Sequence, residues 1–274
     1  DIIGHKRSFL IGTVIFTLAS LACGLSRSIE GLIISRAFQG LGSSFMYPPG
    51  PAIVNNAFPL NQRGRATGIL TGVAGAFLSA GPFLGGFIVT NLPWSWIFYI
   101  NLPVGLAAFL VGFLSIPKDK KHPNQISLDL PGSFLLFFGL GLFVFTLMEG
   151  PNWGWSSIST LGTGGVALFL ILIFLYYLNH SKHPLIDFKI FKIPCFSAGT
   201  ISLFIGQIII ISSIYSALFF QGPLGFTPLE AGLALLPIVL PLIIIGPING
   251  FLIDYFGPRV TITIGLICCT LSCL

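Results

Sequence analysis

Long apolar stretches separated by short polar segments constrain this chain more than any other feature of its sequence. Charged residues make up 8% of the 274 residues, whereas a typical soluble domain has about 25%. So few charges cannot cover a water-facing surface, and most of the chain is therefore expected to face lipid or other apolar helices. The sequence predicts an all-α polytopic membrane protein.

A helix that crosses a bilayer needs about 20 apolar residues, and eight complete stretches of this kind follow one another along the chain. A ninth begins near Val260 and is still too short to span at Leu274. The chain also begins at Asp1 without Met, so we expect a piece of a longer protein. The eight predicted spans are Phe9–Leu25, Leu32–Ala57, Thr67–Thr90, Ile97–Ile116, Leu130–Glu149, Ile158–Leu178, Phe196–Phe220 and Ala231–Ile253.

Basic residues are distributed very unevenly between the loops on the two sides of the predicted membrane. One side has Arg27 alone, whereas the side that contains residue 1 has eleven Lys or Arg. Because basic loops stay in the cytoplasm, this asymmetry predicts a multi-pass protein of the cell membrane with its residue 1 edge on the cytoplasmic side. The eleven residues are Lys6, Arg7, Arg63, Arg65, Lys118, Lys120, Lys121, Lys182, Lys189, Lys192 and Arg259.

A short motif, D-x-x-G-x-[KR], occurs in two predicted cytoplasmic turns. Glycine permits the positive φ of a tight turn. The carboxylate can face a helix N-terminus, and the cation can face a helix C-terminus or lipid phosphates. One copy alone would be an ordinary polar loop, but two copies are typical of transporters built from repeated halves. The motif residues are Asp1, Gly4, Lys6 and Arg7 in the first copy and Asp254, Gly257 and Arg259 in the second.

A single basic residue, Arg36, lies several positions inside the second predicted span. A cation at that depth costs at least about 2.5–3.5 kcal/mol, so Arg36 is expected to face the bundle interior or a wet cavity. Gln39, Gly40, Ser43 and Tyr47 follow at helical spacing and are predicted to share its face. Alternatively, Arg36 is a structural cation that reaches the interface or pairs with backbone carbonyls.

Small residues recur along one face of the third predicted span, where they would let a neighbouring helix approach closely. A proline in the same span frees a backbone carbonyl and is expected to kink the helix. Packing alone would explain this face, and a hinge or seal between two half-bundles would explain it equally well. The face comprises Gly68, Gly72, Gly75, Ser79, Pro82 and Gly86, and Gly81 and Gly85 complete the sequence G-P-F-L-G-G.

In their order along the chain, these motifs resemble the major facilitator superfamily, and within it the fourteen-span drug:proton antiporters. Two further stretches, W-S-W-I-F-Y-I-N-L-P-V-G from Trp94 and G-F-T-P-L-E-A-G from Gly225, are similar to segments of the same group. The resemblance implies spans three to ten and part of span eleven. It assigns 1–117 to the N-terminal bundle, 118–195 to two extra linker helices and 196–274 to the start of the C-terminal bundle.

Two positions depart from the family pattern. Ser95 replaces an Arg that the family usually has at the outer edge. Phe77 stands four residues before Gly81, where the antiporter motif often has Gly, so the small-residue face is expected to be weaker on one side.

The resemblance implies a proton-coupled exporter of amphipathic, often cationic, compounds that works by alternating access. Its partners would be protons, the substrate and the lipid bilayer, and a monomer is expected. Arg36, Gln39 and Gly40 would take part in proton coupling, the small-residue face would seal the export path, and the two cytoplasmic motifs would form gates. Gln207, Tyr215, Phe219 and Gln221 could line a drug cavity or simply pack between helices.

The proton carrier should be a carboxylate inside the membrane, but Glu149 and Glu230 both lie near the predicted outer interface. The carrier is therefore expected on a span outside this sequence.

The main alternative is a major facilitator transporter for one specific solute, since a fold does not fix its cargo. An enzyme is disfavoured because the spans contain no cluster of His, Asp or Glu. The five cysteines include no C-x-x-C pair, so no metal or other cofactor is expected. The absence of a basic stripe with interleaved aromatic residues disfavours nucleic-acid binding.

Overall fold

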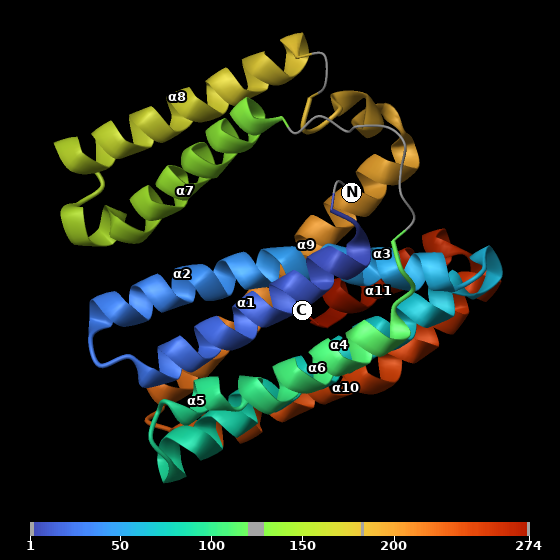
Figure 1. The fold of residues 1–274 in the computed structure, drawn as a ribbon, viewed down its shortest axis with the longest axis horizontal. Helices are drawn as coiled ribbons and strands as arrows, with labels where there is room; N and C mark the ends of the chain where they lie inside the picture. The colour runs from blue at the N-terminus through green and yellow to red at the C-terminus, as the bar shows by residue number, and fades with distance from the viewer. Residues whose placement is uncertain (1–2, 120–128, 182–183, 273–274) are drawn as a thin grey trace. The chain divides into compact units, whose positions relative to one another are not determined.

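The computed structural model describes residues 3–119, 129–181 and 184–272. All regular structure in these ranges is helical, and no strand occurs within them, which confirms the all-α prediction (Figure 1). The helices are α1 (His5–Leu25), α2 (Ile29–Met46), α3 (Pro49–Ala57), α4 (Arg63–Asn91), α5 (Trp96–Tyr99), α6 (Asn101–Ser115), α7 (Leu130–Trp153), α8 (Ile158–His180), α9 (Pro194–Gln221), α10 (Pro228–Phe256) and α11 (Pro258–Ser272), with short 3-10 turns at Leu60–Gln62 and Phe188–Lys192.

Five helical segments in the described residues are long and apolar enough to cross a membrane. They are His5–Leu25, Arg63–Asn91, Trp96–Ser115, Leu130–Trp153 and Ile158–His180. The other three predicted spans coincide with α2–α3, α9 and α10. Among the described residues, α9 and α10 contain shorter apolar stretches, Pro194–Ile208 and Ile244–Phe256. The structure thus confirms a polytopic membrane protein, and the count of eight spans stays a prediction.

The second predicted span, Leu32–Ala57, is not one continuous helix. It is interrupted after Met46, and a new helix begins at Pro49. Pro48, Pro49 and Pro51 have no backbone N–H, so three hydrogen bonds to the preceding turn cannot form. The Gly50 N–H instead donates to the Tyr47 carbonyl at 3.3 Å, a bond of the tighter i→i−3 type.

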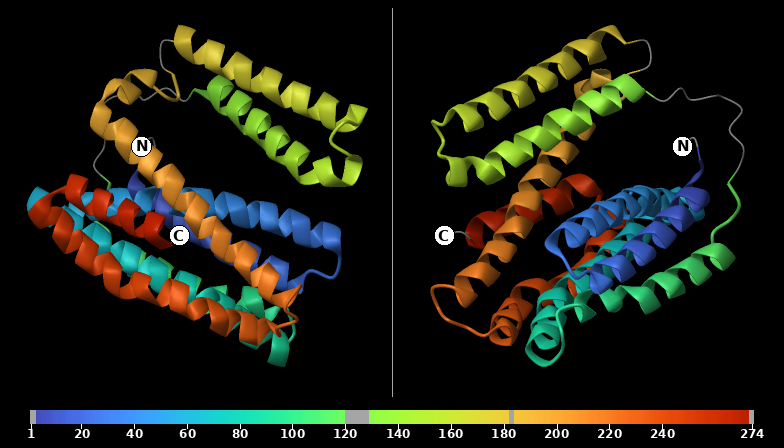
Figure 2. Two further views of the ribbon diagram at one scale, coloured as in Figure 1. Left: turned by 180° about the vertical axis from the view of Figure 1, so that it is seen from behind. Right: turned by 60° about the vertical axis from the view of Figure 1, so that its left-hand side comes forward.

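The chain divides into two compact units. The larger unit combines residues 1–121 with 202–274. Within it, α1 packs on α2 and α6, and α4 packs along α10, beside which it lies in all three views (Figures 1 and 2). The division into 1–117, 118–195 and 196–274 stays a prediction.

The smaller unit, residues 122–201, is built around a hairpin of α7 and α8. The Asp129 carboxylate closes its polar end by accepting hydrogen bonds from the Gly132 N–H, the Tyr177 hydroxyl and the Leu185 N–H, each at 2.9 Å. Desolvation raises the pKa of Asp129, but these three hydrogen bonds together hold it below the ordinary value for an aspartate. Asp129 therefore ties α7, α8 and the segment after α8 together in its ionised form.

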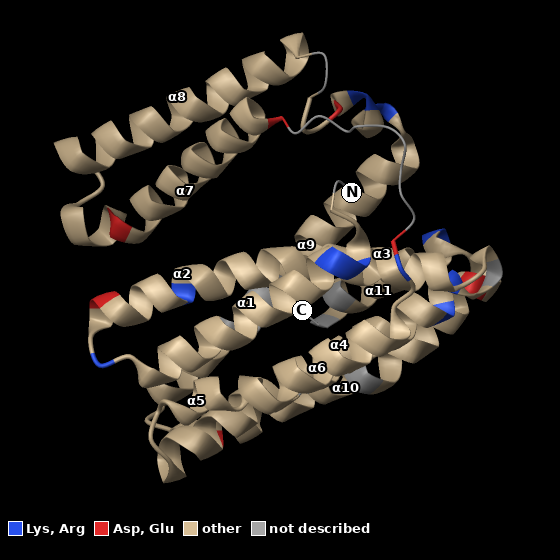
Figure 3. Ribbon diagram, in the orientation of Figure 1, with Lys and Arg blue, Asp and Glu red and all other residues tan. Residues whose placement is uncertain are grey.

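Most residues of the helices are uncharged, as the tan ribbon in Figure 3 shows. In the larger unit, α4 has no Lys, Arg, Asp or Glu after Arg65. This long uncharged segment packs against α10 and forms the centre of the candidate site.

Candidate functional site

The halves of α4 and α10 on the predicted cytoplasmic side touch backbone to backbone. A Cβ atom at Gly68 would lie 2.7 Å from the Gly250 Cα and 2.8 Å from the Gly246 carbonyl oxygen. A Cβ atom at Gly246 would in turn lie 2.7 Å from the Gly72 Cα. Because carbon atoms in contact sit about 3.5–4.0 Å apart, neither helix has room for a side chain at these positions.

The outer halves of the same two helices are equally close. A Cβ atom at Gly86 would lie 2.5 Å from the Pro228 carbonyl oxygen, and one at Gly232 would lie 2.6 Å from the Pro82 carbonyl oxygen. The beginning of α4 contacts the end of α10, and the end of α4 contacts the beginning of α10. The two helices therefore run antiparallel. We call this glycine-lined contact the α4–α10 seam; it comprises Gly68, Gly72, Pro82 and Gly86 of α4 and Pro228, Gly232, Gly246 and Gly250 of α10.

The small residues of α4 do not all serve this seam. Gly72 and Gly75 are buried, whereas a Cβ atom at Gly81 or Gly85 would meet nothing within 4 Å. Gly81 and Gly85 instead line a cavity, together with Phe77, whose side chain is 68% exposed. The expectation that Phe77 weakens the small-residue face is therefore wrong for the seam, because Phe77 points into the cavity.

That residues of α10 meet the glycines of α4 was not predicted from the sequence. Gly246 and Gly250 are four residues apart in an apolar helix, which is the signal that could have identified them.

Asp254, at the end of α10, caps the beginning of α4. Its two carboxylate oxygens accept hydrogen bonds from the Gly64 N–H at 3.0 Å and the Arg65 N–H at 2.8 Å. A negative charge at a helix N-terminus is stabilising because the free N–H groups and the helix dipole both favour it. The predicted pairing of this carboxylate with a helix N-terminus is therefore present, 190 residues away in the sequence.

The glycines of the two cytoplasmic motifs share one backbone conformation. Gly4 has φ 91° and ψ 153°, and Gly257 has φ 81° and ψ 163°. Essentially only glycine adopts this region, so both turns depend on the missing Cβ atom. Asp1, the carboxylate of the first copy, lies outside the described residues.

The first motif has a different anionic partner, Asp119, which the sequence did not suggest. Its carboxylate accepts hydrogen bonds from the Lys6 N–H at 3.0 Å and the Arg7 N–H at 3.2 Å, at the beginning of α1. The Lys6 ammonium group donates to the Phe113 carbonyl at 2.7 Å and to the Ile116 carbonyl at the end of α6. Lys6 thus neutralises a helix C-terminus, as the motif predicted, whereas the side chains of Arg7 and Arg259 are exposed.

Arg36 is the first member of a polar chain that connects α2 to α1. Its guanidinium donates to the Gln39 side-chain carbonyl at 3.0 Å and lies 4.7 Å from the centre of the Phe98 ring. The Gln39 amide donates to the Ser20 hydroxyl at 2.7 Å, and Ser20 donates to the Phe16 carbonyl at 2.8 Å. Gln39 and Ser20 are both buried, so this chain is the polar core of the α1–α2 contact.

The residues predicted to share the face of Arg36 do not all join its hydrogen bonds. Gly40 is exposed, and a Cβ atom there would meet nothing within 4 Å. Tyr47 is 82% exposed because the helix is interrupted there, and Ser43 returns its hydroxyl to the Gln39 carbonyl at 3.1 Å. The structure therefore brings together Arg36 and Gln39 but not Gly40, and it adds Ser20.

Glu149 and Glu230 lie at helix ends, consistent with their predicted place near an interface. Glu149 accepts a hydrogen bond from the Asn152 side-chain amide at 3.2 Å. Glu230 accepts hydrogen bonds from the Thr227 N–H at 2.8 Å and the Thr227 hydroxyl at 2.9 Å, and these bonds lower its pKa. Among the described residues, no three His, Cys, Asp or Glu side chains are grouped as metal ligands.

Comparison with known proteins decides the family. The model of the Major Facilitator Superfamily matches residues 1–274. The chain belongs to this superfamily. Among similar proteins, the Tetracenomycin C resistance and export protein of Streptomyces glaucescens is 32% identical over 268 residues, which cover 97% of this chain and 50% of that protein.

Two further relatives of this superfamily are named for multidrug resistance. The Multidrug resistance protein Stp of Mycobacterium tuberculosis is 34% identical over 274 residues, covering 97% of this chain and 50% of Stp. The Putative multidrug resistance protein MdtD of Salmonella paratyphi A is also 34% identical over 274 residues, covering 97% of this chain and 57% of MdtD. The chain thus spans about half the length of the curated relatives it matches.

Proposed function

We propose that the full-length protein is a proton-coupled exporter of amphipathic, often cationic, compounds in the cell membrane and works as a monomer by alternating access. Membership of the superfamily supports transport. The names of the similar proteins, which refer to drug resistance and export, support efflux of organic compounds.

The observation that carries this proposal is the α4–α10 seam. It joins a helix of 1–117 to a helix of 196–274, the segments that the family pattern assigns to the two bundles. Where glycine meets glycine in the seam, no side chains interdigitate, so the two backbones can tilt against each other while they exclude water. Such a contact suits a transporter whose halves rock about a central path and must not leak protons.

The cytoplasmic end of the seam would act as a gate. Asp254 holds the N-terminus of α4 by two hydrogen bonds that must break when the cytoplasmic ends of α4 and α10 separate. Gly257 and Arg259 follow in the same turn, and the first motif would use Asp1, Gly4, Lys6 and Arg7 in the same way. Each capped helix end contributes about 0.3–1 kcal/mol, an energy that a substrate or proton can overcome.

Proton coupling would involve Arg36 rather than a carboxylate of this chain. Glu230 is held ionised by its bonds to Thr227, and both Glu149 and Glu230 lie at helix ends. The Arg36–Gln39–Ser20 chain extends from the exposed guanidinium into the α1–α2 contact. A protonated carboxylate elsewhere in the full-length protein would be sensed through the charge of Arg36.

The test uses the full-length protein in cells that lack their main exporters. Ethidium efflux is followed with the proton gradient intact, with the gradient collapsed, and for Arg36→Ala with the gradient intact. We expect efflux that needs both the gradient and Arg36. If the protein is present in the membrane but ethidium is retained under every condition, a transporter for one specific solute replaces the drug exporter.

A further inference from the structure

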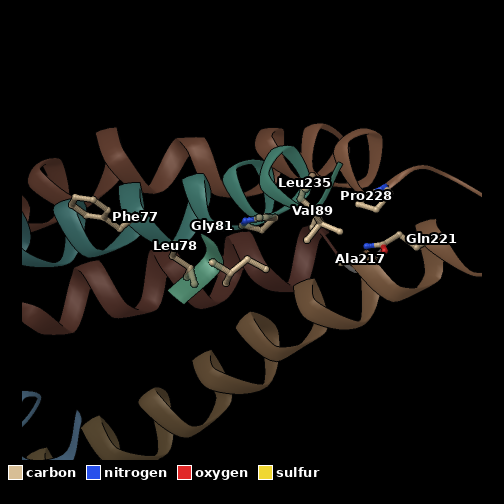
Figure 4. Close-up of a pocket in the computed structure, with 13 residues that line it drawn as sticks. Phe77, Leu78, Gly81, Val89, Ala217, Gln221, Pro228 and Leu235 are labelled. Carbon is tan, nitrogen blue, oxygen red and sulfur yellow. The ribbon is translucent and has the colours of Figure 1, made fainter. Parts of the chain in front are cut away.

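A cavity of about 520 Å³ lies beside the outer half of the α4–α10 seam. Its walls come from four helices, α4, α5, α9 and α10 (Figure 4). The loop between α9 and α10 belongs to the predicted outer side, so the cavity lies toward the side to which an exporter delivers its cargo. Small-molecule sites in proteins have volumes of about 300–1,000 Å³, and this cavity falls within that range.

The walls are apolar with one exception. Of the described residues that line the cavity, only Gln221 has a polar side chain. Figure 4 shows its amide directed from α9 toward Val89, across the cavity. No described residue forms a hydrogen bond with this amide, which therefore offers two donors and an acceptor to a guest. An apolar pocket with a single polar group is the usual design of a site for an amphipathic molecule.

Two glycines keep the cavity open. A side chain at Gly81 or Gly85 would meet no protein atom within 4 Å, so helix packing does not explain glycine at either position. A larger residue would instead extend into the cavity that both glycines line. The same short motif thus provides Pro82 and Gly86 to the seam and Gly81 and Gly85 to the cavity.

We propose that this cavity is a binding subsite for the exported compound, in which Gly81 and Gly85 set the size of the guest and Gln221 supplies its one hydrogen-bonding partner. This inference rests on the proposed function and names the chemistry of its cargo. The guest is a drug-sized molecule with a flat apolar body and a hydrogen-bonding group at one end. The exposed ring of Phe77, at the far end of the cavity from Gln221, provides a surface on which an aromatic guest stacks.

The lining also limits how a charged guest is bound. No carboxylate is among the described residues that line the cavity, so a cationic compound cannot form an ion pair there. Such a compound is held by contacts of its apolar body and by hydrogen bonds from its amine groups. A lipid chain would fill the same apolar walls but would form no hydrogen bond with the Gln221 amide. The amide therefore favours the exported compound over a lipid chain.

The test measures equilibrium binding of ethidium to the purified full-length protein by fluorescence. Gly85→Leu places a bulky side chain in the cavity, and we expect it to weaken binding by about tenfold or more. Gln221→Leu removes the hydrogen-bonding group, and we expect a loss of about fivefold. Leu84→Phe is the matched control, because Leu84 is the adjacent residue of α4, does not line the cavity, and is 39% exposed. It should bind ethidium as the unmodified protein does.

Each outcome decides the subsite separately from the proposed function. Unchanged binding by both Gly85→Leu and Gln221→Leu overturns the subsite, even if gradient-driven efflux is intact. Binding that is weakened in both variants but not in the Leu84→Phe control supports the subsite. This conclusion holds even if efflux is absent and the proposed function fails. A cavity filled only by lipid would show no ethidium binding, or binding that Gln221→Leu does not change, and would also overturn the inference. Because Gln221 is exposed at a helix end, Gln221→Leu keeps the test valid if Gly85→Leu fails to fold.

Discussion

The same substitution at two glycines of α4 should have opposite effects on stability. At Gly68 a methyl group would lie 2.7 Å from the Gly250 Cα and 2.8 Å from the Gly246 carbonyl oxygen. Both neighbours are backbone atoms and cannot rotate away. To restore an ordinary contact distance, α4 and α10 must move apart by about 1 Å, which also loosens the contacts on either side.

The expected cost of Gly68→Ala is about 1–3 kcal/mol, the usual range for extra volume in a close-packed contact. At Gly85 the same methyl group meets nothing within 4 Å. Alanine is a better helix former than glycine, so Gly85→Ala should stabilise the helix by up to about 1 kcal/mol. The two variants should therefore differ by about 1–4 kcal/mol in the free energy of unfolding.

The assay is thermal unfolding of each purified full-length variant in the same detergent, followed by tryptophan fluorescence. We expect the midpoint to fall for Gly68→Ala and to stay the same or rise for Gly85→Ala. Equal midpoints for the two variants would refute a backbone-to-backbone seam, because the substitution is chemically identical and both sites lie on one helix.

Three further predictions concern the polar ends of the helices. Gly4→Ala should destabilise the protein by more than about 1 kcal/mol, because it combines a positive φ with a clash against the Asp119 carboxylate, and thermal unfolding measures this loss. Asp254→Ala should speed hydrogen exchange at the Gly64 and Arg65 amides, the two donors that it accepts from. Asp129→Asn should speed hydrogen exchange at the Leu185 amide, and the effect should be largest at neutral pH. Because the pKa of Asp129 is lowered in the folded protein, the ionised carboxylate stabilises the fold fully above the ordinary aspartate pKa. This stabilisation is lost as the pH falls through the lowered folded-state pKa.

Each of these predictions has a result that would contradict it. An unfolding midpoint for Gly4→Ala equal to that of the unmodified protein would show that the turn relaxes without cost. If Asp254→Ala leaves the exchange rates of the Gly64 and Arg65 amides unchanged, Asp254 does not cap α4. For Asp129, a ratio of exchange rates between variant and unmodified protein that stays constant with pH would show that the ionised carboxylate contributes nothing.

The helices could be predicted from the sequence because a bilayer leaves a chain few choices. An apolar run of about 20 residues must satisfy its own backbone hydrogen bonds, so its length alone predicts a helix. The positive φ at Gly4 and Gly257 was also predictable, since a short turn between two helices needs it. The prediction of one continuous span over Leu32–Ala57 was wrong at Pro48, because it considered apolar composition and not the backbone N–H groups that proline lacks.

Partners across helices could not be predicted in the same way. Asp119 stands in a loop rich in lysine, and nothing local shows that it caps α1, more than one hundred residues away. Ser20 is one of many small polar residues in the spans, and its bond to Gln39 depends on the register of α1 against α2. The split of the α4 glycines between seam and cavity likewise depends on where α10 lies. Such pairings follow from tertiary packing, which no single segment contains.

Proton-coupled export is best tested with the purified full-length protein reconstituted in liposomes, with a pH gradient imposed across the membrane. Ethidium movement and proton movement are recorded together. We expect ethidium to move against its own gradient when protons flow the opposite way, and Arg36→Ala to uncouple the two. Ethidium movement that is equally fast with and without the pH gradient would contradict proton-coupled export.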